Sequence, residues 1–389
     1  MTVDFDTQID RSGSNSLKFD ARQAYFGRVD VMPMWVADMD FAAPQAVTDA
    51  LVQRAQHPLY GYTMYPDSLY QSMIDWCHRR YDWEIKHTEI MMCPGVVPSL
   101  HAAIQALTEP NAKVIVQPPV YFPFFSAVTQ TGRELVLNPL QLQDGEYSFD
   151  LNHFEECAKQ GAKLLLLCSP HNPVGRVWRS DELQALLDIA ERYQITIISD
   201  EIHADLIYPG QRHLPLADMT DSVNIITAIA PSKTFNIPGM GLSTLVVPDK
   251  SQRKQINQVF DSWHVSAANP FSITAFEAAY QHGEAWLDDL MRYLANSLQW
   301  VADFVASEIP QMSLIQPEGT YLLWFDCRDL GLDNQALRRF FIDEAGVGMN
   351  PGYVFGDCGS GFMRMNIGTP QQQVEQAMQQ IASALRKAF

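Results

Sequence analysis

Short apolar runs, each ending in a polar or proline-rich segment, recur through the middle of the chain. The runs at 114–116, 164–168, 195–198 and 223–229 are rich in Val, Ile and Leu, and a helix is expected at 180–193 between two of them. Strands of almost continuous apolar sequence are typical of parallel sheets that helices cover on both faces. The pattern therefore predicts an α/β fold with a mostly parallel central sheet flanked by helices.

The region before these runs predicts an arm and several helices. Residues 1–45 are expected to form an extended arm, because their central part lacks helical periodicity. Proline suits the first turn of a helix, so a helix is expected at 44–56. Another helix is expected at 68–81, and residues 90–99 are expected to form a loop that leads into a further helix.

The pattern changes after Pro270. A long helical stretch at 272–307 contains a single glycine and is followed by an expected strand at 319–326, a helix at 334–344 and a strand at 362–368. These elements predict a second, smaller α+β domain. We therefore expect three parts, namely an arm at 1–45 that contributes to the small domain and the active site, a large domain at 46–270 and a small C-terminal domain at 271–389.

Composition and charge exclude several classes of function. The 389 residues carry a formal net charge of -18, which disfavours nucleic acid as a partner. No apolar run is long enough to span a bilayer, and the N-terminus lacks the features of a signal peptide, so we expect a cytoplasmic protein without a membrane partner. The six cysteines are scattered and form no C-x-x-C pair, which predicts neither a metal site nor a disulfide framework.

Three consecutive apolar runs lead to chemically active side chains. Asn172, Asp200 and Lys233 follow or end the runs, and the carboxyl ends of parallel strands meet at one edge of a sheet. An amine that forms a Schiff base, a carboxylate that holds a pyridinium proton and an amide that donates to a ring oxygen are what pyridoxal 5′-phosphate (PLP) requires. Each residue alone has a plainer interpretation as a surface lysine, a helix cap or a turn; their order favours the cofactor site.

Four further residues are candidates for the same site. Val96 and Val97 follow Gly95 at an expected helix start, where free N–H groups bind phosphate well. Tyr121 lies in an aromatic loop and is expected either to stack on the cofactor or to pack in the core. Arg364 offers a planar fork that suits a carboxylate, with a structural ion pair as the alternative.

Several motifs together resemble one known family. They are MWVADMDF at 34–41, YGY at 60–62, SDEIH at 199–203, SKTFN at 232–236 and GFMRMNIG at 361–368. The whole chain resembles the fold-type I PLP-dependent enzymes of the class I/II aminotransferase family. Within it the motifs are most similar to the cystathionine β-lyase (C–S lyase) branch, the MalY/PatB type. The resemblance implies the PLP-dependent transferase fold and a place in methionine biosynthesis.

The resemblance also implies a role for each candidate. For the cofactor ring, it makes Lys233 the Schiff-base lysine, Asp200 the partner of the pyridine nitrogen, Asn172 the donor to the ring oxygen and Tyr121 the stacking residue. The phosphate ligands would be Val96, Val97 and Ser232, and Tyr62 would contact the phosphate of a neighbouring subunit in a homodimer. Arg364 would clamp the substrate carboxylate, and the substrate pocket would be lined by Trp35, Val36 and Ala37.

Two positions depart from the pattern of many aminotransferases. His203 stands where they carry a tyrosine that donates to the ring oxygen, so it either substitutes for that donor or leaves the contact unmade. Gly241 stands where they carry a phosphate-binding arginine. Both departures resemble the lyase branch.

The function that follows is α,β-elimination from cystathionine or a related cysteine thioether, giving pyruvate, ammonia and a thiol. Lys233 would act as the base that removes the Cα proton. An aminotransferase remains the alternative, since it shares the early steps. A PLP-binding regulator without catalysis is a remoter one, because no basic DNA-binding segment precedes the arm.

Overall fold

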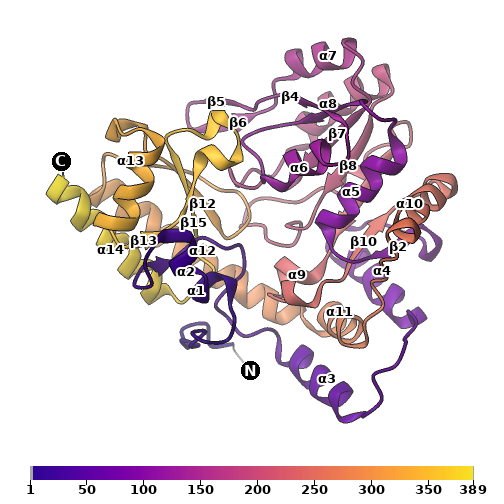
Figure 1. Cartoon of the computed structure of the whole chain (residues 1–389), viewed down its shortest axis with the longest axis horizontal. Coiled ribbons are helices and arrows are strands. Elements are labelled where there is room, and N and C mark those ends of the chain that lie inside the picture. The colour runs from indigo at the N-terminus through magenta and orange to yellow at the C-terminus, as the bar shows by residue number, and fades with distance from the viewer. Residues whose placement is uncertain (1–2, 389) are drawn as a thin grey trace.

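A seven-stranded sheet forms the centre of the computed structural model, which describes residues 3–388 (Figure 1). Its strand order is β2-β10-β9-β8-β7-β3-β4, and only β10 runs antiparallel to its neighbours. The strands are β2 (Ile90–Cys93), β3 (Lys113–Val116), β4 (Glu134–Leu137), β7 (Leu164–Cys168), β8 (Thr196–Asp200), β9 (Ile225–Ile229) and β10 (Ser243–Val246). The predicted α/β fold with a mostly parallel sheet is confirmed.

Helices cover both faces of this sheet because its strands are apolar on both faces. Leu165 and Leu167 pack in one cluster with helices α7 and α8, whereas Leu164 and Leu166 pack in another with α5, α6 and α10. This alternation follows from the period of two along a strand. The helices of this region are α3 (Gln45–Gln56), α4 (Asp67–Tyr81), α5 (Val96–Leu107), α6 (Pro123–Thr129), α7 (Leu151–Lys159), α8 (Ser180–Tyr193), α9 (Pro231–Thr234), α10 (Lys250–Trp263) and α11 (Pro270–His282).

The C-terminal region forms a separate four-stranded antiparallel sheet in the order β11-β12-β15-β14. Its strands are β11 (Ser313–Ile315), β12 (Leu322–Asp326), β14 (Asn350–Pro351) and β15 (Phe362–Asn366). Helices α12 (Glu284–Glu308), α13 (Asn334–Arg339) and α14 (Gln371–Ala388) belong to the same region. The hairpin of β5 (Gln141–Gln143) and β6 (Glu146–Ser148) is a small separate sheet.

The N-terminal arm lies against this C-terminal region (Figure 1). Strand β1 (Met32–Pro33) pairs in parallel with β13 (Val347–Gly348). Two short helices, α1 (Leu17–Asp20) and α2 (Arg22–Phe26), precede β1, so the arm is less extended than its sequence predicts. The arm then leads past the carboxyl edge of the central sheet on its way to α3.

Most of the expected helices form within a residue or two of their predicted bounds, and two predictions need correction. The helical stretch predicted at 272–307 is two helices, α11 and α12, which meet at Gly283. A Cβ atom at Gly283 would lie 2.3 Å from Cε1 of Phe235, so the close approach of these segments requires glycine. Residues 90–93, predicted as part of a loop, form strand β2, whose pairing with β10 the local sequence does not reveal.

Candidate active site

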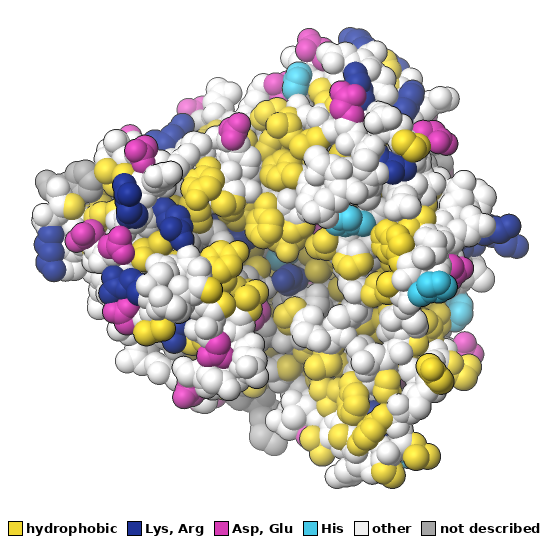
Figure 2. Space-filling model, in the orientation of Figure 1, with side chains coloured by type: hydrophobic (Ala, Val, Ile, Leu, Met, Phe, Trp, Pro, Cys, Tyr) yellow, Lys and Arg dark blue, Asp and Glu magenta, His cyan; other side chains and the backbone are white. Residues whose placement is uncertain are grey.

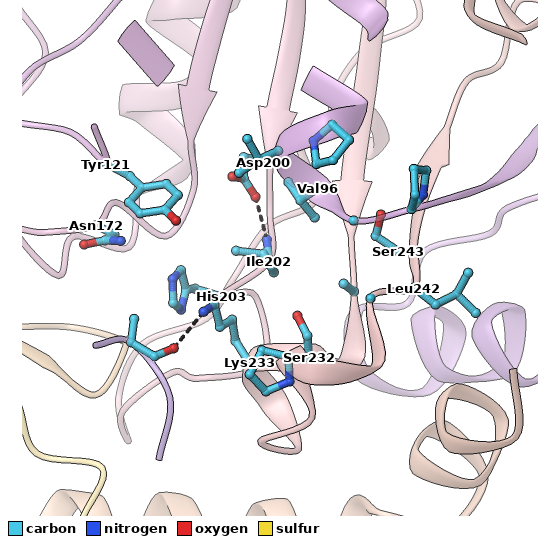
Figure 3. A pocket seen from close by; sticks show the side chains of 18 of the residues that line it. Val96, Tyr121, Asn172, Asp200, Ile202, His203, Ser232, Lys233, Leu242 and Ser243 are labelled. Atoms are coloured by element: carbon cyan, nitrogen blue, oxygen red, sulfur yellow. Dashed lines mark hydrogen bonds between the residues drawn. The ribbon is translucent and has the colours of Figure 1, made fainter. Parts of the chain in front are cut away.

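The three candidate residues at the strand ends line one cavity. Strands β7, β8 and β9 are neighbours in the sheet, so the segments that follow them lie together. Asn172, Asp200 and Lys233 all face a cavity of about 280 Å³ (Figure 3). Because the three strands are neighbours in the sheet, an amide, a carboxylate and an amine lie together in one site.

Lys233 lies in the first turn after β9 with its amine held by the arm. Its Nζ donates to the carbonyl oxygen of Ala37 at 2.7 Å, and the hydroxyl of Tyr321 donates to the same oxygen at 3.0 Å. Burial lowers the pKa of Lys233 to about 8. An amine with this pKa is partly unprotonated near neutral pH, which an attack on an aldehyde requires.

Asp200 lies buried at the end of β8. Its carboxylate accepts one hydrogen bond within the described residues, from the backbone N–H of Ile202 at 3.2 Å. Burial raises the pKa of Asp200 to about 7. No Lys, Arg or His side chain within residues 3–388 forms an ion pair with it. A buried carboxylate without a cation is costly, and the protonated nitrogen of a pyridine ring would compensate for it.

Arg364 in β15 is a buried cation held by neutral acceptors. Its Nη1 donates to Oδ1 of Asn172 at 3.0 Å, and its Nη2 donates to the carbonyl oxygen of Trp35 at 3.0 Å and to Oδ1 of Asn350 at 2.7 Å. Burial lowers its pKa to about 10, and its Nε has no partner. Among the residues described, no carboxylate neutralises this guanidinium, so the site favours an anion beside it.

The bond between Asn172 and Arg364 also orients the amide of Asn172. Its Oδ1 is occupied as an acceptor, which leaves Nδ2 as the group that can donate to a ring oxygen. The ring of Tyr121 lies beside Asn172 in the cavity, and the backbone N–H of Tyr121 donates to the carbonyl oxygen of Asn172 at 3.0 Å (Figure 3). A flat ring bound here would lie among Tyr121, Asn172 and Asp200.

The opposite end of the cavity offers a site for phosphate. Helix α5 begins at Val96 after Gly95, which has a φ of 120°, and Val96 and Val97 both line the cavity. Amide groups of a first helical turn have no partner within the helix and bind anions well. Ser232 lines the same end together with Gly241, which supplies no side chain.

These groups fit PLP: an amine for its aldehyde, a carboxylate that accepts from its pyridine nitrogen and helix N–H groups that donate to its phosphate. His203 lines the cavity beside Lys233, and burial lowers its pKa to about 3, so the ring is neutral at physiological pH. Its Nδ1 is buried without a partner. A neutral imidazole with a free nitrogen can make a hydrogen bond to a cofactor at this position.

The structure places one of the three residues predicted to line the substrate pocket in the cavity. Ala37 lines the cavity, but Trp35 and Val36 do not. The Trp35 side chain packs in an apolar cluster with Phe26, and its Nε1 donates to the carbonyl oxygen of Lys18 at 3.0 Å. Trp35 therefore contributes its backbone carbonyl to Arg364, and not its ring to the pocket, because the apolar indole is buried against the arm.

Tyr62 does not reach the cavity of its own chain. It lies in the exposed segment between α3 and α4, and its side chain is fully exposed. This position neither supplies nor excludes a contact to a second subunit.

Two residues without a predicted role also shape the site. Tyr321 shares the Ala37 carbonyl with Lys233, and Asn350 helps to hold Arg364. Tyr321 lies in a predicted strand, and Asn350 lies between a predicted helix and a predicted strand. Neither position carries a signal of its role, because the contacts join segments far apart in the chain.

Comparison with known proteins identifies the family. Residues 29–381 match the family described as aminotransferase class I and II. The chain belongs to this family. It is 37% identical to cystathionine beta-lyase PatB of Bacillus subtilis, over 98% of this chain and 100% of that protein.

Solved structures are similar in fold over almost their whole length. A PLP-bound protein of Clostridium difficile 630, named as a candidate aminotransferase, is 40% identical with a TM-score of 0.97, covering 98% of this chain and 100% of that one. The PLP-bound C-S lyase of Staphylococcus hominis is 31% identical with a TM-score of 0.93, covering 99% of this chain and 98% of that one. The predicted family, fold and use of PLP are thereby confirmed, and the predicted C–S lyase is favoured over the aminotransferase.

Across residues 3–388, no helix is both long and apolar enough to cross a membrane. In the same part of the chain, no group of three or more His, Cys, Asp or Glu side chains is placed to hold a metal ion.

Proposed function

We propose that this protein cleaves the Cβ–S bond of cystathionine or a related cysteine thioether. The products are pyruvate, ammonia and a thiol, which is homocysteine when cystathionine is cleaved. The observation that carries the proposal is the buried Lys233 amine, which faces Asp200 in one cavity close to the unpaired cation Arg364. The likeness to proteins named as cystathionine and C–S lyases supports it.

Bound PLP supplies the electron sink that stabilises negative charge at the substrate Cα. Arg364 binds the substrate α-carboxylate, since it is a buried guanidinium without a carboxylate partner. The unprotonated Nζ of Lys233 removes the Cα proton, and the Ala37 carbonyl keeps this amine in position. Asp200 would hold the proton on the pyridine nitrogen of the bound cofactor. The Cβ–S bond breaks as the thiolate leaves with the bonding electron pair and takes up a proton. The aminoacrylate that is released reacts with water to give pyruvate and ammonia.

Other residues of the cavity would hold the phosphate and the ring of the cofactor. The backbone N–H groups of Val96 and Val97 and the hydroxyl of Ser232 bind the phosphate, which offsets the missing arginine at Gly241. Tyr121 stacks on the ring and Asn172 donates to its oxygen. His203 contributes a hydrogen bond from its neutral imidazole.

A turnover assay separates elimination from transamination. Purified protein with PLP and cystathionine, but without an added keto acid, is expected to release pyruvate and homocysteine in equal amounts over many turnovers. An aminotransferase needs a keto-acid acceptor to regenerate its cofactor, so it stops after about one turnover per site. Both products are followed with time, by lactate dehydrogenase coupling and by a thiol reagent. Product formation that depends on added keto acid would show an aminotransferase.

The proposed enzyme is a homodimer in which Tyr62 of each chain contacts the phosphate in the neighbouring subunit. Leu59, Tyr60, Tyr62 and Met64 are exposed on one segment, and such an apolar surface favours burial in an interface. Analytical ultracentrifugation is expected to give a dimer. Tyr62→Ala is expected to weaken PLP binding by about tenfold, as for the loss of one good phosphate contact, with the dimer preserved. A monomeric wild-type protein would contradict the proposal.

We also propose that the enzyme works in the cytoplasm, in methionine biosynthesis. The six cysteines are free in the structure, which suits a reducing compartment. Fractionation of cells would test the location, and recovery of protein outside the cytoplasmic fraction would contradict it.

A further inference from the structure

A second cavity lies beside the arm, and the proposed mechanism does not use it. Its volume is about 570 Å³, and α2 of the arm, α13 and the segments around β14 surround it. Aromatic side chains form much of its wall, namely those of Tyr25, Phe26, Phe122 and Tyr353. Figure 2 shows hydrophobic side chains gathered around the hollow of this face, and Tyr25, Phe122 and Tyr353 are partly exposed.

One wall residue of this second cavity contacts the group that is proposed to bind the substrate carboxylate. Asn350 lines it, and Oδ1 of the same residue accepts from Nη2 of Arg364 at 2.7 Å. Asn350 and Arg364 are direct cross-strand partners of β14 and β15. On the other side, Phe122 follows Tyr121, which lines the cofactor cavity. Two residues of the second cavity are thus direct neighbours of the cofactor site, Asn350 through its hydrogen bond to Arg364 and Phe122 through the chain.

Arg338 is the cationic group in the wall of the second cavity. Its Nη2 donates to the carbonyl oxygen of Tyr25 at 2.5 Å, which occupies one of its five donors. Within the described residues, Arg338 forms no ion pair. A half-buried guanidinium with unused donors, set in an aromatic wall, suits an apolar ligand that ends in a carboxylate.

We propose that the second cavity binds the sulfur substituent of the substrate and that Arg338 binds a carboxylate at its far end. This inference rests on the proposed lyase function and specifies its substrate class. The preferred thioethers carry a chain of several carbons that ends in a carboxylate. Cystathionine belongs to this class, whereas S-methylcysteine has a substituent too short to enter the cavity.

Three thioethers and two variants test the proposal. The substrates are S-(4-carboxybutyl)cysteine, its terminal amide, which is equal in size but uncharged, and S-methylcysteine. Wild-type enzyme is expected to prefer the carboxylate to the amide by about tenfold in kcat/KM, mainly through KM, as for one charge-assisted contact. Arg338→Gln is expected to remove this preference and to leave S-methylcysteine cleavage unchanged.

Arg339→Gln is the matched control, because it removes the same charge from the same helix at an exposed position outside the cavity. It is expected to keep the preference for the carboxylate. If Arg338→Gln also loses S-methylcysteine cleavage, Arg338→Lys takes its place, since it retains the charge and is expected to retain part of the preference. Equal wild-type rates for acid and amide, or a preference that survives in Arg338→Gln, would overturn the proposal.

A binding measurement separates this inference from the lyase function. The acid 5-(methylthio)pentanoate lacks the amino-acid group, so its binding does not depend on turnover. Calorimetry is expected to show about tenfold weaker binding to Arg338→Gln than to wild type. Equal binding would refute the subsite even in an active lyase. Failure to release pyruvate from cystathionine and from all three thioethers would refute the lyase function, and calorimetry would still decide the subsite.

Discussion

Replacement of Lys233 by alanine is expected to abolish turnover, with a loss of at least about 10⁴-fold in kcat. The change removes both the amine that anchors the cofactor and the base that takes the Cα proton. No other lysine lines the cavity in the described part of the chain, so no neighbouring amine can replace it. Pyruvate release from cystathionine measures the loss, and circular dichroism checks the fold.

Two comparisons show whether the loss of turnover comes from the missing amine. Lys233→Arg keeps a cation near the Ala37 carbonyl, but a guanidinium is not a base at neutral pH, so it is expected to be as inactive as alanine. Added methylamine is expected to restore part of the activity of Lys233→Ala, because a small amine can occupy the vacated space. An alanine variant with near wild-type turnover would show that Lys233 is not the base.

Asp200→Asn is expected to lower kcat by about 10²–10³-fold, a loss comparable to that of one preorganised charged contact. Asparagine has the same shape but cannot hold a proton on the pyridine nitrogen by charge, so negative charge at Cα is less stabilised. The rate of pyruvate release measures the effect. The absorbance spectrum of bound PLP provides a second signal, because it responds to the protonation of the ring.

The free energy of unfolding and the catalytic rate are expected to respond differently to Asp200→Asn. Folding raises the pKa of Asp200 from 3.8 to about 7, so the folded protein without PLP binds more protons than the unfolded chain between these values. Stability is therefore lost as pH rises through this window, and asparagine avoids that loss. The apoprotein of Asp200→Asn is expected to be no less stable than wild type at pH 8, measured by urea unfolding.

Glu201 provides the matched control for a buried carboxylate. It accepts from Ser199 Oγ at 2.8 Å and from the backbone N–H of Leu216 at 3.1 Å, and it contacts His213, outside the cofactor cavity. Glu201→Gln is expected to lower stability by about 1–3 kcal/mol, because it disrupts a buried network. Its kcat is expected to stay within about threefold of wild type. If Asp200→Asn kept the wild-type kcat while Glu201→Gln lost it, Asp200 would have no role in the mechanism.

Much of the fold could be predicted from local patterns, and the failures have a common cause. The strands β7, β8 and β9 are apolar runs with clear ends, so the sequence predicts both their type and their order. The sequence predicts a loop at the edge strand β2, because the pairing that makes it a strand joins residues 90–93 to residues 243–246 of β10. The break at Gly283 depends on the ring of Phe235, which no local window contains.

The chemical groups of the site, and the edge of the sheet at which they lie, follow from the order of residues along the chain. Lys233, Asp200 and Asn172 follow three apolar strands, and a parallel sheet brings such strand ends together. The surroundings of these groups depend on how distant segments pack against one another. Burial sets the pKa of Lys233 and of Asp200, the Ala37 carbonyl and Tyr321 hold the amine, and Asn350 connects Arg364 to a second cavity. These are contacts between distant segments, and desolvation arises only when all of them are packed together.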